Sequence, residues 1–426
     1  MSDVELAVER AVELAERLLA TSSTDRAQWR FARLVADESG KRLAIGFADQ
    51  VLRIRDDARA AARFRSLLAE HGAPAFAGVT DRALLRVGAG ASRLAPTLVM
   101  PLVRRRIRSE TSNVIISAHD PELREHIAAR RAAGMHLNVN LLGEAILGED
   151  EAANRLQATI ELAQRDDVDY VSVKLSAICS QLNVVAFDES VELVSARLRD
   201  LYRATAEAGA FVNLDMEEYK DLAMTKAAFT SVLSSPDLDH LDAGIVLQAY
   251  LPDSHDALDE LAAWSVARHA RTGATVKVRI VKGANLAMER VEAELRDWPH
   301  APFTSKPDVD ASYKRLVDAA MRVGPALRVG VASHNLYDVA WALVQRDRLG
   351  ATDRVEIEML EGMAEAQARA VRAEAGSILL YAPVVKRTER DSAIAYLVRR
   401  LEENAAPENF LRHLFDGRDL DGERTR

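Results

Sequence analysis

Charged residues lie within several short apolar stretches of the sequence. YVSVKLS (170–176) carries Lys174, FVNLDMEE (211–218) carries Asp215, and VKVRIVKGA (276–284) carries Arg279. A buried charge without a partner costs several kcal/mol, so these side chains are not expected to face an apolar layer. Mutual pairing satisfies them, and it also forms a polar cavity that can hold a charged ligand.

A second candidate is the pair of adjacent arginines in AYLVRRLEEN (395–404). At about 100° per residue, a helix over this stretch has a polar stripe opposite an apolar one. Helix geometry alone favours a polar stripe that faces water, and a stripe that faces a ligand is the alternative. The polar stripe contains Tyr396, Arg399, Arg400 and Glu403.

The elements that must position these groups alternate from about residue 136 onward. Eight apolar, strand-like runs are each followed by an amphipathic, helix-like stretch, over roughly 270 residues. This pattern predicts an α/β fold, a distorted (β/α)8 TIM barrel, and a doubly wound open sheet is the second choice. The strand-like runs cover 136–143, 170–176, 211–218, 244–250, 276–284, 327–335, 355–362 and 377–385.

In such a barrel, chemistry takes place at the carboxyl ends of the strands. Glycines 209, 273, 350 and 376 stand where the helices between the runs should stop. The runs themselves bring a set of polar residues to the same end of the barrel. The strand-end residues are Asn140, Glu144, Lys174, Ser176, Asn213, Asp215, Glu217, Gln248, Tyr250, Arg279, Lys282, Gly283, His334, Asn335, Glu358, Glu361 and Tyr381.

The first 110 residues show helical periodicity without a convincing strand. We predict a helical arm over residues 1–110 and a barrel over residues 111–426. The arm ends in a basic cluster within LAPTLVMPLVRRRIRSE, Arg104 to Arg108. An ordinary solvated face is the simplest interpretation of that cluster, and contact with phosphate or an anionic membrane surface is the alternative.

Composition narrows the functional classes. The chain of 426 residues has 56 basic and 65 acidic residues, and a net charge of -9 opposes non-specific nucleic-acid binding. One cysteine, Cys179, excludes intrachain disulfides, and no apolar run approaches the ~20 residues of a membrane span. The acidic, amphipathic N-terminus is not a secretory signal, so we predict a cytoplasmic protein.

Common motifs are missing or incomplete. The sequence has no GxxxxGK[ST] loop, no GxSxG elbow and no HExxH pair, so neither a P-loop nor a zinc site is expected. LLRVGAGASR has Gly88 and Gly90, but Arg93 replaces the third glycine of a dinucleotide-binding fingerprint. Cys179 is more typical of a small buried apolar residue than of a nucleophile.

Seven stretches in order resemble the catalytic domain of proline dehydrogenases, in particular the corresponding half of bacterial bifunctional proline utilisation proteins. They are VSVKLS, NLDMEE, GIVLQAY, VKVRIVKGA, VASHN, YAPVV and YLVRRLEEN, and the resemblance extends from about residue 110 to 410. It implies an FAD enzyme that oxidises L-proline to 1-pyrroline-5-carboxylate by hydride transfer and passes electrons to a membrane quinone. No aldehyde dehydrogenase module is recognisable, so we expect either a stand-alone enzyme or a fragment of a bifunctional protein.

The resemblance also implies roles for residues at the substrate site. Arg399 and Arg400 would hold the proline carboxylate, since guanidinium groups match carboxylate geometry. Tyr381 and Tyr396 would wall the pyrrolidine ring, and Glu144 would pair with the first arginine and close the site. Lys174 and Asp215 would form a charged pair beneath the substrate, with Lys174 either a proton acceptor or a structural ion-pair partner.

A second group matches positions along the flavin. Arg279 would reach the N5 edge and Gln248 the pyrimidine edge, while other residues would follow the rest of the cofactor. Asn285 and Leu286 replace an aromatic pair that many family members have. The cofactor group comprises Gln248, Arg279, Val281, Lys282, Gly283, Ala284, Thr304, Lys306, His334, Asn335 and Glu403.

Two other classes of function stay open on the sequence. Lysines at strand ends serve in Schiff-base lyases, and Lys174 or Lys282 could take that role. A non-catalytic barrel scaffold that recruits a partner is the third hypothesis. The membrane quinone implies peripheral contact with the inner face of the cytoplasmic membrane, and nothing in the sequence points to a nucleic-acid partner or a metal.

Overall fold

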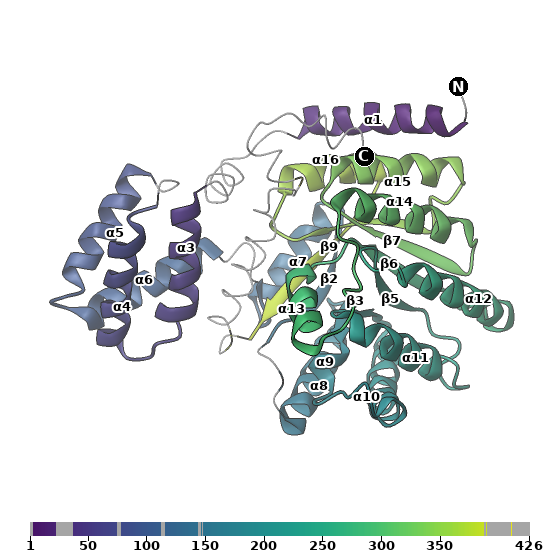
Figure 1. The fold of residues 1–426 in the computed structure, drawn as a ribbon, viewed down its shortest axis with the longest axis horizontal. Helices are drawn as coiled ribbons and strands as arrows, with labels where there is room; N and C mark the ends of the chain where they lie inside the picture. Colours follow the sequence, from purple (N-terminus) through teal and green to yellow (C-terminus); the bar gives the residue numbers. More distant parts are fainter. Residues whose placement is uncertain are drawn as a thin grey trace.

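Eight parallel strands close into a barrel (Figure 1). Each strand pairs with the next from β2 to β9, and β9 pairs back with β2 over its first seven residues. The computed structural model describes residues 3–22, 37–74, 78–111, 116–143, 146, 148–386, 389 and 410. The barrel strands are β2 (Met135–Leu141), β3 (Tyr170–Lys174), β4 (Phe211–Asp215), β5 (Ala243–Gln248), β6 (Val276–Val281), β7 (Leu327–Ala332), β8 (Val355–Leu360) and β9 (Ile378–Val385).

All eight predicted strands are therefore confirmed, and closure confirms the barrel over the open sheet. One strand was not predicted: β1 (Ile116–Ser117) pairs with the carboxyl end of β9. Two residues are too few to show the alternation by which a strand is recognised.

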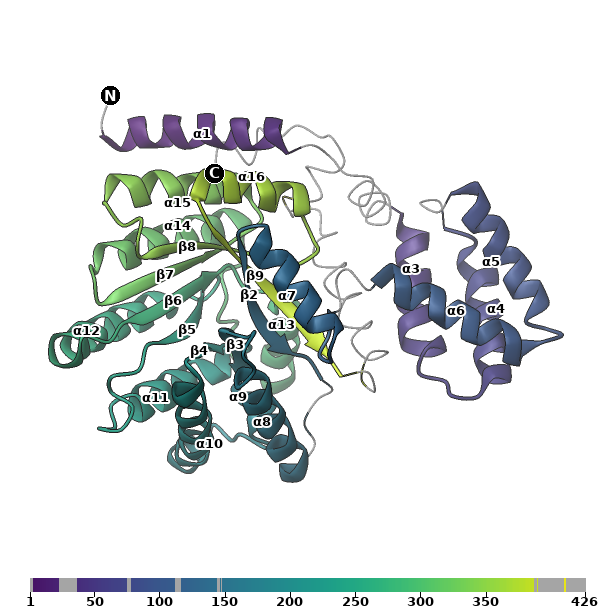
Figure 2. The same ribbon diagram turned by 180° about the vertical axis from the view of Figure 1, so that it is seen from behind.

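Helices surround the barrel, as the alternating pattern predicts (Figures 1 and 2). Gly209 and Gly273 end two of them in the left-handed conformation, with φ of 75° and 76°. The helices are α7 (Glu122–Ala132), α8 (Glu149–Ala163), α9 (Leu175–Ile178), α10 (Phe187–Ala208), α11 (Leu222–Val232), α12 (Ser254–Thr272), α13 (Leu286–Arg296), α14 (Lys306–Arg322), α15 (Leu336–Arg348) and α16 (Glu365–Ala375), with a 3-10 turn at Tyr219–Asp221.

The strands have apolar outer faces and polar inner faces. On β6, Val276, Val278 and Ile280 are buried against the helix layer, whereas Lys277 and Arg279 alternate with them toward the barrel axis. Because successive side chains of a strand point to opposite faces, each strand can anchor the fold and line the interior at once.

The helices before the barrel form two separate groups. Helix α1 (Asp3–Thr21) packs on α15 and α16, and its buried Leu14 and Leu18 belong to the barrel core. The others stand to one side of the barrel (Figure 2): α3 (Glu38–Gly46), a π-helical turn (Phe47–Val51), α4 (Asp57–His71), α5 (Val79–Ala91) and α6 (Pro96–Thr111). The helical character of residues 1–110 is thus confirmed where the structure describes them, while the domain boundary at 110 stays a prediction.

Helices α3 to α6 have a small core of their own. Phe47 and Phe64 meet edge to face with ring centroids 5.4 Å apart, and Leu67 and Met100 are buried beside them. The same cluster includes Leu142 and Val385, at the carboxyl ends of β2 and β9. This helical group therefore contacts the end of the barrel at which chemistry is expected.

Among the described helices, none is both long and apolar enough to cross a membrane. The predicted helix over 395–404 lies outside the described residues. Beyond it, Phe410 is buried in the barrel core, with its ring 6.4 Å from that of Tyr337. Cys179 is also buried, and burial raises the pKa of its thiol to about 11, which fits a packing role.

Candidate active site

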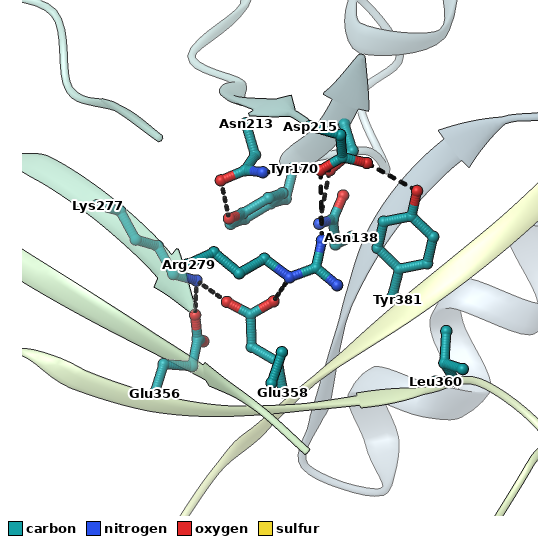
Figure 3. Close-up of polar contacts among 12 residues, drawn as sticks. Asn138, Tyr170, Asn213, Asp215, Lys277, Arg279, Glu356, Glu358, Leu360 and Tyr381 are labelled. Carbon is teal, nitrogen blue, oxygen red and sulfur yellow. Dashed lines mark hydrogen bonds and ion pairs between the residues drawn. The ribbon is translucent and has the colours of Figure 1, made fainter. Parts of the chain in front are cut away.

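A column of paired charges fills the barrel interior (Figure 3). At the end of the column away from the barrel mouth, Lys277 Nζ lies 2.7 Å from Glu358 Oε1 and also pairs with Glu356. Burial opposes the charge on Lys277, but the two carboxylates outweigh burial and raise the lysine pKa. Lys277 and Glu358 are each only 1% exposed, so this ion pair is almost fully removed from water.

Arg279 continues the column toward the barrel mouth. Its Nε lies 2.9 Å from Glu358 Oε2, and its Nη1 lies 3.3 Å from Asp215 Oδ1. The guanidinium carbon also lies 4.6 Å from the ring centroid of Tyr381. Figure 3 shows the guanidinium lying between the two carboxylates and beside the tyrosine ring. The charged strand residues therefore pair with one another, as the sequence predicts.

Asp215 joins this column to Tyr381. The Tyr381 hydroxyl donates to Asp215 Oδ2 at 2.8 Å and accepts a hydrogen bond from the Asn140 amide. Asp215 Oδ1 accepts from Asn213 at 2.9 Å and from Ser172 at 3.2 Å. With all these bonds, neither the carboxylate nor the phenol can turn without losing a buried partner.

A glycine makes room for the column. A Cβ atom on Gly330 of β7 would lie 2.2 Å from Glu358 Oε1 and 2.9 Å from Lys277 Cε. Any larger residue would displace the ion pair. Glycine at position 330 therefore leaves the space that the ion pair between Lys277 and Glu358 occupies.

The family resemblance implies a charged pair between Lys174 and Asp215, whereas the structure gives each of them an ion pair with another residue. Lys174, at the end of β3, pairs with Glu217, which also accepts a hydrogen bond from Ser176. Asp215 instead takes Arg279 as its cation. The carboxylate beside Lys174 supports the interpretation of this lysine as an ion-pair partner.

Lys282 follows β6 and is held by two buried aspartates. Its Nζ lies 2.7 Å from Asp338 Oδ2 and also pairs with Asp310, which lies 2.7 Å from Lys306 Nζ. Burial opposes the lysine charge, but Asp338 and Asp310 outweigh it and raise the pKa of Lys282. An ammonium held in this way is a poor amine nucleophile, so the site does not favour a Schiff base at Lys282.

The backbone after β6 needs glycine. Gly283 has φ of +121°, and a Cβ atom there would lie 2.5 Å from the ring of Tyr250. Tyr250 is fixed in turn, because its hydroxyl lies 3.2 Å from Glu289 Oε1 and its backbone nitrogen donates to the Lys282 carbonyl at 2.8 Å. The segment containing Val281, Gly283 and the exposed Ala284 therefore has a defined course at the mouth.

Two strand-end residues have unused hydrogen-bonding atoms. Gln248 is buried and donates its amide to the carbonyls of Met216 and Glu217, which leaves Oε1 without a partner among the described residues. His334 Nε2 accepts a hydrogen bond of 3.0 Å from the backbone nitrogen of Leu360, so Nδ1 carries the proton when the ring is neutral. That Nδ1 is likewise buried and unpaired in the described part of the chain.

Burial keeps His334 neutral by lowering its pKa to about 4. A neutral donor and a neutral acceptor, left open at the ends of β7 and β5, suit an uncharged polar ligand such as a heterocyclic ring system. Because both atoms also lie at the carboxyl ends of strands, where barrels of this kind bind their ligands, they are candidate ligand contacts.

The remaining predicted cofactor residues have varied surroundings. Thr304 is exposed in the loop before α14, and Lys306 begins that helix. Asn335 caps α15, with its side-chain oxygen accepting from the Tyr337 nitrogen at 3.0 Å. Five predicted site residues lie outside the described residues: Glu144, Tyr396, Arg399, Arg400 and Glu403.

Some interior groups were missing from the predicted site. Lys277 and Glu356 precede Arg279 and Glu358 by two positions on the same strands, and this spacing was the available signal, since alternate residues share a face. Asp310 and Asp338 lie on helices, where an aspartate is usually solvated, so no local pattern distinguishes them.

Comparison with known proteins agrees with this architecture. The family model described as proline dehydrogenase matches residues 123–413. The curated proline dehydrogenase of Deinococcus radiodurans is 26% identical over 284 residues, which are 65% of this chain and 80% of that protein. The chain spans only 19% of the length of the curated bifunctional PutA proteins that it matches first.

Two solved structures of proline utilization A (PutA) are also similar. The protein from Corynebacterium freiburgense is 45% identical with a TM-score of 0.68, and the match covers 73% of this chain and 33% of that chain. The protein from Bdellovibrio bacteriovorus is 27% identical with a TM-score of 0.83, over 98% of this chain and 44% of that chain.

A closed parallel barrel with a charged interior and polar strand ends defines a (β/α)8 protein with an enzyme-like mouth. The chain belongs to the proline dehydrogenase family, and it is similar to the corresponding part of PutA proteins.

Proposed function

We propose that the protein oxidises L-proline to 1-pyrroline-5-carboxylate, with FAD bound at the barrel mouth and a quinone as the final electron acceptor. The main support is the match to the family model across the barrel, which includes every strand that contributes to the charged column. The Deinococcus radiodurans relative bears the name of this activity.

The residues at the mouth fit a flavin. Gln248 Oε1 can accept from a ring N–H and His334 Nδ1 can donate to a ring or ribityl oxygen, and both atoms are buried without a described partner. Gly283 lets the backbone after β6 approach closely, so that the loop with Lys282 can follow the cofactor, and Lys306 would stand near its phosphate-bearing part. The flavin supplies a hydride acceptor that no amino-acid side chain can replace.

Arg279 would supply a fixed positive charge beside the flavin. Its guanidinium is fixed by Glu358 and Asp215, so a positive charge is kept in place without rearrangement during the reaction. We also propose that Val281, Ala284, Thr304, Asn335 and Glu403 complete the cofactor contacts that the family resemblance implies.

The substrate needs a grip on its carboxylate and a free amine. A hydride leaves the ring carbon next to nitrogen only when the nitrogen lone pair can assist, so proline must react with its amine unprotonated. We propose that Arg399 and Arg400 bind the carboxylate, while Tyr381 and Tyr396 wall the ring and Glu144 closes the site. Because Asp215 and Asn140 hold the Tyr381 hydroxyl, that wall is rigid.

A proline titration under exclusion of oxygen tests the proposal. The purified protein should show a flavin spectrum, and L-proline should bleach it. N-propargylglycine, which inactivated the Bdellovibrio bacteriovorus relative, should abolish proline-dependent dye reduction. A colourless protein, or a flavin that proline does not reduce, contradicts the proposed function.

The carboxylate clamp has a sharper test. Arg400→Met should raise the KM for proline by about 10- to 100-fold, since a charged hydrogen-bonding partner of the substrate is lost, while flavin content is retained. Arg203→Met is the matched control, because Arg203 pairs with Asp237 on the surface of the barrel, where both side chains are well exposed. Loss of flavin in Arg400→Met, with KM unchanged, would overturn the clamp.

A further inference from the structure

The outer surface of α5 and α6 is apolar. Six large apolar side chains on these helices and the turn between them are between 66% and 92% exposed. Helix α5 has no fully buried residue at all. The six are Val79, Leu84, Val87, Leu94, Leu98 and Leu102.

These side chains form stripes, one on each helix. On α5, the exposed residues Thr80, Ala83, Leu84, Val87 and Ala91 recur at helical spacing, and none of them is charged. On α6, the exposed stripe comprises Leu98, Pro101, Leu102 and Arg105, with Leu94 just before the helix.

The stripes are not needed for packing within the helical group. The opposite sides of the two helices already supply the inner contacts, through Leu85 and Ala89 on α5 and through Met100 and Val103 on α6. A surface helix normally carries polar residues on the side away from its core. Here both sides are apolar, so the outer side is suited to a second apolar surface.

The charge around the stripes selects the kind of surface. Residues 78–106 contain six arginines and a single acidic residue, Asp81, although the whole chain has a net charge of -9. Arg86, Arg93 and Arg105 are exposed beside the apolar residues. Apolar side chains flanked by arginines bind the interface of an anionic bilayer, where the chains insert between lipids and the guanidinium groups meet the headgroups.

We propose that the outer stripes of α5 and α6 dock the protein on an anionic membrane surface. The inner side of this helical group contacts the barrel mouth through Leu142 and Val385, at the carboxyl ends of β2 and β9, so docking by the outer side leaves the helical group between the lipid and the mouth. The proposal rests on the proposed function in one respect: a quinone acceptor lies in the membrane that the stripes would bind.

Vesicle cosedimentation of the full chain tests the docking. Phosphatidylcholine vesicles with about one-third phosphatidylglycerol should bind the protein, whereas vesicles of phosphatidylcholine alone should bind it weakly, because the arginines gain no headgroup charge. The double variants Leu98→Glu with Leu102→Glu and Leu84→Glu with Val87→Glu should each reduce binding about tenfold or more. Val266→Glu is the matched control, because Val266 is 48% exposed on the barrel helix α12.

A charge series separates the two contributions. Arg86→Gln with Arg105→Gln should weaken binding to the anionic vesicles and flatten its dependence on salt, while the response to neutral vesicles stays the same. Unchanged binding in all stripe variants, or a wild-type protein that does not bind the anionic vesicles, would overturn the proposal.

Two further measurements distinguish membrane docking from self-association and from a failure of the proposed activity. If wild-type protein self-associates in size-exclusion chromatography and Leu98→Glu with Leu102→Glu abolishes that association without affecting vesicle binding, the stripes are a protein interface and the membrane proposal fails. Proline-dependent reduction of a soluble dye should be the same in the stripe variants and the wild type. Absence of that reduction in the wild type contradicts the proposed function and leaves the vesicle result to stand on its own.

Discussion

The barrel interior and the outer side of α5 and α6 depart from ordinary protein architecture in opposite directions. The interior buries Lys277, Arg279 and Glu358, whereas the helices expose leucines and valines. In the barrel, each charge is paired, and Gly330 leaves the space that the pairing needs. On the helices, the six large apolar side chains are between 66% and 92% exposed, and neither hydrophobic cluster of the described residues includes them.

The two regions also differ in what their side chains contribute to the stability of the fold. Buried ion pairs contribute little net stability but are expensive to break, so the interior depends on all of its members. An exposed leucine contributes almost nothing to folding, so the stripes can change freely without loss of the fold. The two regions should therefore respond very differently to substitution.

Lys277→Met should have the largest effect on stability. It leaves Glu356 without its buried cation and Glu358 with only Arg279, so the free energy of unfolding should fall by about 3–5 kcal/mol. Urea denaturation followed by circular dichroism measures the change. Arg203→Met, at the exposed pair with Asp237, should cost no more than about 1 kcal/mol, and equal losses in the two variants would contradict the special status of the interior.

Two glycine substitutions sharpen the comparison. Gly330→Ala should lower the free energy of unfolding by about 1–3 kcal/mol, since its Cβ would overlap Glu358. Gly88→Ala in α5 meets open space and should raise it by about 0.5–1 kcal/mol, because alanine favours the helix. A gain in stability from Gly330→Ala would show that the interior is not closely packed around the ion pair.

His334 should make stability depend on pH. Its pKa in the folded state is about 4, below the ordinary value of 6.5, so the unfolded state binds more protons between these values. Stability is then complete above about pH 6.5 and is lost as the pH falls toward 4. Between pH 7 and pH 5, the loss from this group should be about 2 kcal/mol.

His334→Gln should remove that part of the loss, as measured by urea denaturation at the two pH values. His240→Gln, at an exposed position, is the control and should leave the difference between pH 7 and pH 5 unchanged. The same loss in His334→Gln as in the wild type would show that His334 is not held neutral by burial.

Leu98→Glu with Leu102→Glu should have the smallest effect on folding. Both side chains project into solvent, so the free energy of unfolding should change by less than about 0.5 kcal/mol, again by urea denaturation. A loss of several kcal/mol would mean that the stripe is part of the core of the helical group.

The fold could be predicted from the sequence because its signals are local and repeated. The eight apolar runs appear as strands and the amphipathic stretches between them as helices, and Gly209 and Gly273 end their helices as expected. The packing of α1 on α15 and α16 could not be predicted, because an amphipathic helix shows which face is buried but not which neighbour covers it.

The charged residues on the strands were easier to predict than the residues with which they pair. Lys174, Asp215 and Arg279 stand out because charges are rare in apolar strands, yet partners depend on register across the barrel. The structure pairs Arg279 with Asp215 and Lys174 with Glu217. The roles of Arg399 and Arg400 remain predictions, since both residues lie outside the described part of the chain.

The pairing of β9 with β2 has a consequence for synthesis of the chain. The strand that closes the barrel, β9, begins at Ile378, about 240 residues after the start of β2, with which it pairs. Until the ribosome releases that last strand, both β2 and β8 present open edges on which another nascent chain can add. Production of this protein should therefore be most vulnerable to aggregation late in translation, and truncation just before Ile378 should yield insoluble protein.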